Sequence, residues 1–352
     1  MISTKPEPIG GHKTNNQSRL IYMIRMKTVR NLGGFRIVPM VAAGSVLLLG
    51  PPALAGLVIN PTFTANFNAN FGANAAAAQA AWISAASVFS ANFSDNVAIN
   101  ITVDGVAGTG VFGQSSTFLI SPSYANLRNR FVADATTASD NIAIGAGGSI
   151  SAADPTGGAG TWWVSRAQAK AIGLIASDGA NDGTTTFGAG NPFTFSGAIA
   201  PGTYDFKGVA AHEISEVLGR LGISGGTIGS FANSYSAIDL FSFTGANTRG
   251  LGNGAGNNFS IDNGTTLIKL FNDAAANGLD SRDWAPGTDD AFNQFASPGV
   301  VSGVSATDLK LMDVLGYDLV PVPEPATGAL IAAGLGLFFV GARQRRGQRA
   351  QP

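Results

Sequence analysis

The charged residues of this chain are unevenly distributed, and their distribution limits which part of it can fold as a domain. Residues 1–55 carry seven lysines and arginines against one acid, and the last thirty residues carry four arginines against one acid. Each end also contains a mainly apolar run without charge, at 37–50 and at 326–342. Apolar runs next to basic clusters are typical of export and membrane segments. We therefore expect a single folded domain between them, roughly residues 56–320.

The composition of the central part excludes several classes of protein. Residues 56–321 contain ten basic and twenty acidic side chains, which argues against a nucleic-acid-binding protein, because such a protein needs a basic surface. The chain has no cysteine. Disulfide scaffolds, thiolate zinc sites and cysteine nucleophiles are therefore excluded.

The N-terminal extension, residues 1–55, ends in a pattern typical of a secretory signal peptide. Lys27, Arg30 and Arg36 form a positive region, an apolar run of 14 residues follows at 37–50, and Ala53-Leu54-Ala55 places small residues where signal peptidase reads them. We expect cleavage after Ala55. The alternative is an uncleaved N-terminal anchor.

The C-terminal segment, residues 321–352, has three ordered parts. Pro323-Glu324-Pro325 precedes the apolar run 326–342, and four arginines follow that run. A run of this length is near the lower limit for a transmembrane helix. The segment resembles the PEP-CTERM sorting signal of Gram-negative bacteria. The resemblance implies a transient inner-membrane anchor, cleavage by an exosortase, and release to the cell surface or extracellular matrix. The alternative is a plain C-terminal anchor.

Hydrophobic spacing and capping residues predict an α+β domain. Ser123 or Ser121, Ser165 and Asp205 are the expected helix caps. The expected helices are 73–93, 123–135, 166–174, 206–221 and 305–315, and the expected strands are 96–106, 184–187, 192–195 and 238–243.

The residues that can carry chemistry are concentrated in one short stretch. Between residues 56 and 321 the chain has one histidine, His212, and two glutamates, Glu213 and Glu216. On a helix His212 and Glu216 lie one turn apart on the same side. Ile214, Val217 and Leu218 lie on the opposite side. The pattern predicts a helix whose apolar face enters the core while its His/Glu face borders a cleft.

The stretch from Phe206 to Gly219 resembles the active-site helix of metzincin-like zincin metalloproteases, with His-Glu-x-x-Glu in place of His-Glu-x-x-His. The segments 167–174 and 305–317 are similar to other parts of those proteins, so the resemblance covers residues 160–320. It implies a zincin domain with a twisted mixed sheet, in which His212 and Glu216 bind the metal and Glu213 is the general base. The usual third ligand is absent, because Gly222 stands at its position.

The resemblance leaves the rest of the site to be assigned. Zincins of the glutamate type take an acidic third ligand from further along the chain, and we expect Asp239 in that role; the alternative is a carboxylate that caps a turn or bonds a backbone amide. Zn²⁺ is the expected metal, and one histidine with two carboxylates also suits Mn²⁺ or Fe²⁺. We expect Tyr235, or else Tyr317, to stabilise the oxyanion. Arg220 is expected to be a structural ion-pair partner.

Two acidic loops are possible calcium sites, although turn formation explains them equally well. They are 178–183 and the group Asn272, Asp273, Asp280 and Asp283. The leading functional hypothesis is a secreted metal-dependent endopeptidase acting on proteins or peptides. The alternatives are a catalytically inactive zincin fold kept as a surface or biofilm-matrix protein, and a purely structural matrix protein.

Overall fold

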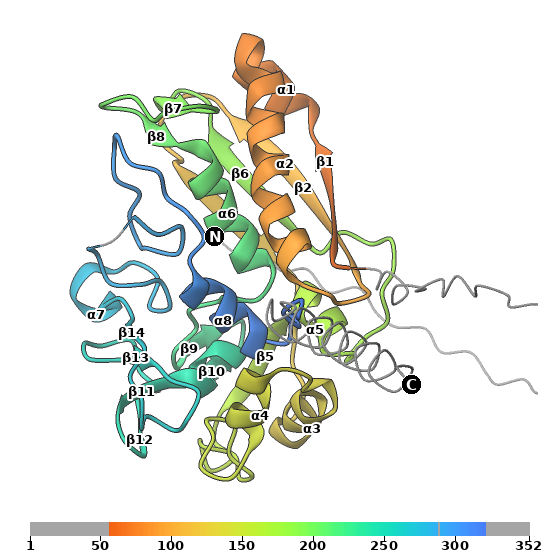
Figure 1. The fold of residues 1–352 in the computed structure, drawn as a ribbon, viewed down its shortest axis with the longest axis vertical. Coiled ribbons are helices and arrows are strands. Elements are labelled where there is room, and N and C mark those ends of the chain that lie inside the picture. The colour runs from red at the N-terminus through yellow and green to blue at the C-terminus, as the bar shows by residue number, and fades with distance from the viewer. Residues whose placement is uncertain (1–55, 288, 322–352) are drawn as a thin grey trace, which may run out of the picture. The chain divides into compact units, whose positions relative to one another are not determined.

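The computed structural model describes residues 56–287 and 289–321, and these residues form an α+β structure with several small sheets (Figure 1). The expected α+β class is therefore confirmed. The helices are α1 Ala65–Phe71, α2 Ala75–Asn92, α3 Tyr124–Asp134, α4 Ala138–Ile144, α5 Arg166–Ala171, α6 Phe206–Val217, α7 Ala274–Asn277 and α8 Ala306–Val314, with 3-10 turns at η1 Gly72–Asn74 and η2 Ala237–Phe241.

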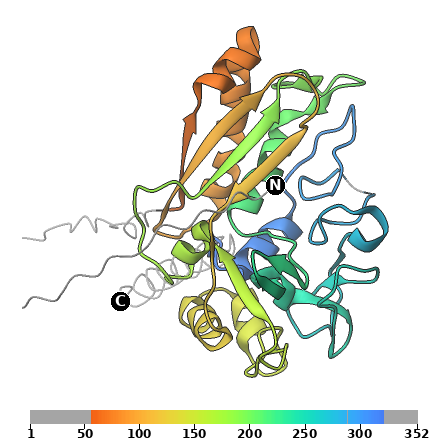
Figure 2. The ribbon, with the colours of Figure 1, turned by 180° about the vertical axis from the view of Figure 1, so that it is seen from behind.

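The sheet with the longest strands is mixed and has the strand order β1-β2-β6-β3. Its strands are β1 Val58–Phe63, β2 Ala98–Val106, β6 Gly183–Gly188 and β3 Gly113–Thr117. The first three run parallel, and β3 pairs antiparallel with β6 at one edge. Burial alternates along β2, as expected for a strand with one face towards the core. Helices α2 and α6 cover one face, and Figure 2 shows the other face from behind.

Three further sheets complete the described fold. Their strand orders are β4-β5-β10-β9, β12-β11-β13-β14 and β7-β8. The strands are β4 Leu119–Ile120, β5 Thr161–Ser165, β7 Phe193–Thr194, β8 Tyr204–Asp205, β9 Gly226–Ile228, β10 Phe231–Ser236, β11 Ser242–Gly245, β12 Thr248–Arg249, β13 Asn258–Phe259 and β14 Lys269–Leu270.

Specific residues determine where helix α6 begins and where it ends. Asp205 caps it by accepting a hydrogen bond from the amide of Lys207. The helix ends four residues earlier than expected, since Gly219 adopts φ +122° and a Cβ there would lie 2.9 Å from the side chain of Gln168. Ile214, Val217 and Leu218 are fully buried. The apolar face of α6 therefore anchors in the core, as its spacing predicts.

Most of the expected elements are confirmed, with ends shifted by a few residues. Ser123, Ser165 and Ser305 cap α3, α5 and α8. The strand expected at 238–243 is wrong: Ala237–Phe241 forms a 3-10 turn, and the strand begins at Ser242. All five residues of that turn are buried, so no alternating pattern of exposure exists there to define a strand.

No helix within residues 56–287 and 289–321 combines the length and apolar character that a membrane span requires. The expected signal peptide and the expected transmembrane sorting helix both lie outside the described residues.

Candidate metal centre

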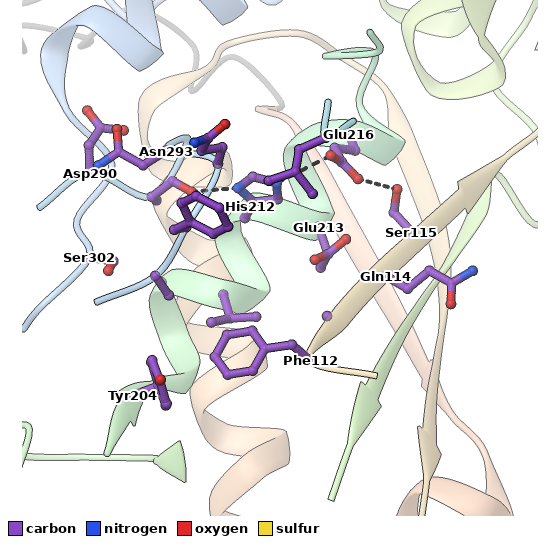
Figure 3. Close-up of a pocket in the computed structure, with 18 residues that line it drawn as sticks. Phe112, Gln114, Ser115, Tyr204, His212, Glu213, Glu216, Asp290, Asn293 and Ser302 are labelled. Carbon is purple, nitrogen blue, oxygen red and sulfur yellow. Dashed lines mark hydrogen bonds and ion pairs between the residues drawn. The ribbon is translucent and has the colours of Figure 1, made fainter. Parts of the chain in front are cut away.

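Helix α6 brings His212, Glu213 and Glu216 to the wall of one cavity of about 570 Å³ (Figure 3). The edge strand β3 forms part of the same wall through Gly113 and Ser115. The segment that follows Trp284 supplies further wall residues, among them Asp290, Ala291, Asn293 and Phe295. The predicted cluster therefore borders a cleft.

Three possible ligand atoms meet beside this cavity, and the third comes from Asp283, which lies behind the lining residues His212 and Glu216. One donor atom each from His212, Glu216 and Asp283 lies within 4.8 Å of the others. The Nε2 atom of His212 is 3.3 Å from Oε1 of Glu216 and 3.6 Å from Oδ1 of Asp283. Bonds of about 2.0–2.2 Å to a tetrahedral zinc ion place neighbouring ligand atoms about 3.3–3.6 Å apart. The types of donor atom and the two distances from Nε2 of His212 are therefore compatible with a divalent transition metal.

Neighbouring groups hold the two ligands on α6 in place. The Nδ1 atom of His212 lies 2.9 Å from the carbonyl oxygen of Ala291. Because a carbonyl oxygen only accepts, Nδ1 carries the proton, and Nε2 is the nitrogen that faces the two carboxylates. The hydroxyl of Ser115 donates to Oε2 of Glu216 at 2.6 Å. Such partners orient metal ligands in proteins.

Arg220 lies beside both carboxylates and is fully buried. Its Nη1 forms an ion pair with Oδ1 of Asp283, and its Nη2 lies 3.6 Å from Oε1 of Glu216. Its guanidinium also packs 4.7 Å from the ring centre of Phe292. The expectation that Arg220 is a structural ion-pair partner is confirmed. Its charge compensates part of the negative charge of the donor set.

Burial and neighbouring charges shift the pKa values of His212, Glu213 and Glu216. Burial and Arg220 act to lower the pKa of His212, but Asp283 and Glu216 outweigh them and raise it to about 9. Burial acts to raise the pKa of Glu216, but His212, Arg220 and Ser115 hold it at about 2. Burial and the charge of Glu216 raise the pKa of Glu213 well above its usual range. A carboxylate with a raised pKa is a better general base near neutral pH.

Metal binding should therefore release a proton. With the pKa of His212 raised to about 9, the imidazole is protonated at neutral pH, and a metal that takes Nε2 must displace that proton. As the pH rises towards this pKa, the apparent affinity for zinc should increase about tenfold per pH unit, and above the pKa it should become constant. Calorimetric zinc titrations at pH 7, in two buffers of different ionisation enthalpy, measure the released protons. An affinity that is constant between about pH 6 and 8 would contradict the expectation.

Asp239, the third ligand expected from the sequence, is not among the residues that meet here. Its Oδ1 accepts from Nε of Arg282 at 2.7 Å and its Oδ2 from the amide of Ser236 at 2.7 Å. Ser224 donates to both of its oxygens. Asp239 and Arg282 are both fully buried. Asp239, a residue of η2, thus forms a buried ion pair with Arg282, and Asp283 lies where the sequence led us to expect Asp239.

Neither expected tyrosine lines the cavity. The ring of Tyr235 packs against Trp162 with 5.5 Å between ring centres. Tyr317 is fully buried and donates its hydroxyl to the carbonyl of Leu218 at 2.8 Å. Both therefore have structural roles. Among the described tyrosines, the one that lines the cavity is Tyr204.

Sequence reasoning did not place Asp283 beside His212 and Glu216. A Cβ on Gly222, the usual position of the third ligand, would lie 1.9 Å from Oδ1 of Asp280. The loop around Asp280–Asp283 thus occupies the space from which that ligand would come. The signal in the sequence was the acidic group that includes Asp280 and Asp283, for which the sequence left a calcium site and turn formation open. The other expected calcium loop is neutralised by cations, because Arg166 and Lys170 pair with Asp178 and Asp182.

Comparisons with known proteins bear on the C-terminal tail alone. Residues 321–346 match the family model of the PEP-CTERM protein-sorting motif. The motif indicates export and sorting to the cell surface by an exosortase, as the resemblance implied. No curated protein and no solved structure matches the chain.

Proposed function

We propose that this protein is a metal-dependent endopeptidase of zincin type that acts on proteins or peptides outside the cell. The observation that carries the proposal is the meeting of His212, Glu216 and Asp283 within 4.8 Å beside a cavity that Glu213 also lines. The sorting motif supports the extracellular location.

His212, Glu216 and Asp283 would hold the metal, with zinc as the first choice and Mn²⁺ or Fe²⁺ as alternatives. When bound, the metal would supply the Lewis acidity that polarises a peptide carbonyl and makes water a nucleophile. The donor set fits this role, since Nε2 of His212 faces the two carboxylates and Arg220 compensates part of their charge.

Glu213 is the proposed general base. Its carboxylate is buried, lines the cavity and is adjacent in sequence to a metal ligand. A Cβ on Gly113 would lie 2.3 Å from Oε1 of Glu213, so a larger residue at that position of β3 would displace this carboxylate. Glu213 would take a proton from the attacking water and pass it to the leaving amine.

The cavity also suits an extended peptide. Strand β3 pairs with β6 on one side only and borders the cavity, so a substrate segment could add to it by backbone hydrogen bonds. Asn293 and Tyr204, which both line the cavity, carry groups able to donate a hydrogen bond to a developing oxyanion.

The second candidate is a catalytically inactive zincin-type domain that serves as a surface protein. One observation favours it: the buried guanidinium of Arg220 pairs with Asp283 and lies 3.6 Å from Glu216, so a protein cation can balance the charge of these carboxylates. In that case the cluster would be a structural element and the cavity would bind without hydrolysis.

Metal removal distinguishes the two candidates. We expect the zinc-loaded protein to cleave unfolded proteins and internally quenched peptides. A chelator should abolish this activity, and zinc or manganese should restore it, because a bound metal supplies the electrophile. Product peptides are identified by mass spectrometry. Absence of cleavage by a fully metal-loaded protein across a diverse peptide library would favour the inactive candidate.

A further inference from the structure

The carbonyl group that orients His212 belongs to a piece of chain whose conformation is fixed by a neighbouring carboxylate. Nδ1 of His212 lies 2.9 Å from the carbonyl oxygen of Ala291, which is 79 residues further along the chain (Figure 3). Asp290 directly precedes Ala291, and its Oδ1 accepts from the amide of Phe292 at 2.8 Å. A carboxylate that binds the amide two residues later holds the intervening peptide in a turn. The direction of the Ala291 carbonyl therefore depends on Asp290.

A lysine on strand β14 holds Asp290 in this position. Nζ of Lys269 donates to Oδ2 of Asp290 at 2.6 Å, and the side chain of Asp290 is only 5% exposed. Burial acts to raise the pKa of Asp290, but hydrogen bonds from Asp308 and Lys269 lower it below its usual range. Asp290 is therefore ionised at neutral pH, and both of its oxygens accept. One oxygen binds the turn around Ala291 and the other binds β14.

The same lysine lies beside the residue that follows Asp283. Nζ of Lys269 is 4.9 Å from the ring centre of Trp284, which is fully buried. The amide of Trp284 donates to the carbonyl of Phe292 at 2.9 Å. The ring of Phe292 packs against the guanidinium of Arg220, which pairs with Asp283. The lysine and its partner carboxylate therefore hold both pieces of chain that reach helix α6 from further along the sequence.

We propose that Asp290, held by Lys269, is a positioning residue of the candidate metal centre. It keeps the carbonyl of Ala291 on Nδ1 of His212, so that the imidazole presents Nε2 to the metal in one orientation. Partners of this kind fix the tautomer and the ring orientation of metal-binding histidines. Asp290 acts through Ala291 and is not itself one of the possible ligands. The inference rests on the proposed function for its metal, but it does not require that the protein hydrolyses peptides.

A matched control for the Lys269–Asp290 pair exists elsewhere in the fold. Lys170 and Asp182 also form a lysine–aspartate ion pair, with 2.7 Å between Nζ and Oδ2, and both side chains are fully buried. Neither of these two residues lines the cavity. Loss of this pair should reduce stability, because it leaves a buried charge without a partner. It should not change the orientation of His212.

Zinc affinity of the full chain, measured by competition with a chromophoric chelator, tests the inference. Asp290→Ala should bind zinc about 10–100-fold more weakly than the wild type, which is the usual cost of losing an outer partner of a metal ligand. Asp182→Ala should lower the free energy of unfolding but leave the zinc affinity of the folded protein unchanged. Lys269→Met should also weaken zinc binding, and Lys269→Arg, which keeps the charge, should retain most of the affinity. If Asp290→Ala does not fold, the comparison of Lys269→Met with Lys269→Arg decides.

A proton resonance distinguishes positioning from a general loss of stability. In the zinc-loaded wild type, the Nδ1 proton of His212 should exchange slowly with water, and its signal is identified by its absence in His212→Ala. The signal should broaden in zinc-saturated Asp290→Ala, because the Ala291 carbonyl no longer holds the proton, and it should persist in Asp182→Ala. A wild-type protein that binds no zinc would contradict the proposed function and this inference together. Tight zinc binding by the wild type, with the same affinity and the same signal in Asp290→Ala, would overturn this inference alone.

Discussion

Replacing Glu213 with glutamine should lower the rate of peptide hydrolysis by about 10²–10⁴-fold while leaving the fold and the metal in place. Glutamine has nearly the same shape as glutamate, so it fits beside Gly113, where the space is limited. It cannot accept the proton of the attacking water. The measurement is kcat/KM on a cleaved peptide, with the metal content of the same sample determined in parallel.

The control for this variant is Gln114→Ala, which removes an exposed side chain from the same cavity wall without touching the proposed base. Its effect on kcat should be much smaller than that of Glu213→Gln. If Glu213→Gln kept more than about a tenth of the wild-type activity with its metal bound, Glu213 would not be the general base.

Asp283→Asn should lower the affinity for zinc by at least about 100-fold, which exceeds the usual cost of losing an outer partner of a metal ligand. The change keeps an oxygen that can accept from Arg220, so the buried guanidinium retains an acceptor. It removes one of the two negative charges that face Nε2 of His212. Competition with a chromophoric chelator measures the affinity.

Asp239→Asn is the matched comparison, because it makes the same chemical change at the ligand first expected from the sequence. This variant should lose stability by about 3–5 kcal/mol, since Arg282 is left buried without its counter-charge. Its folded fraction should nevertheless bind zinc as tightly as the wild type. The reverse pattern, with metal lost in Asp239→Asn and kept in Asp283→Asn, would restore the assignment from sequence.

The parts of the fold predictable from sequence are those determined by local chemistry. Helix caps such as Ser123, Ser165 and Asp205 act within three residues of themselves, so short sequence windows contain the whole signal. The one-turn spacing of His212 and Glu216 is local in the same sense. The buried turn Ala237–Phe241 was mistaken for a strand because burial on all sides removes the periodicity on which such predictions depend.

The proposed third ligand could not be found in this way. Asp283 reaches His212 from a distant part of the chain, through a loop that occupies the space next to Gly222. Asp239 has the residue type that the role requires, but its partner Arg282 lies 43 residues further along the chain. Which of the two aspartates lies beside His212 depends on which loop packs against α6. Tertiary contacts determine that packing, and they cannot be seen in a short sequence window.

The most direct test of the central claim is the metal content of the purified protein, measured by elemental mass spectrometry beside His212→Ala and Asp283→Asn. After exposure to zinc and manganese and removal of unbound metal, we expect about one transition-metal ion per wild-type chain and a small fraction of that in both variants. A wild-type protein without metal, or variants that keep it, would contradict the proposed site and leave the cluster on α6 as a network of ion pairs.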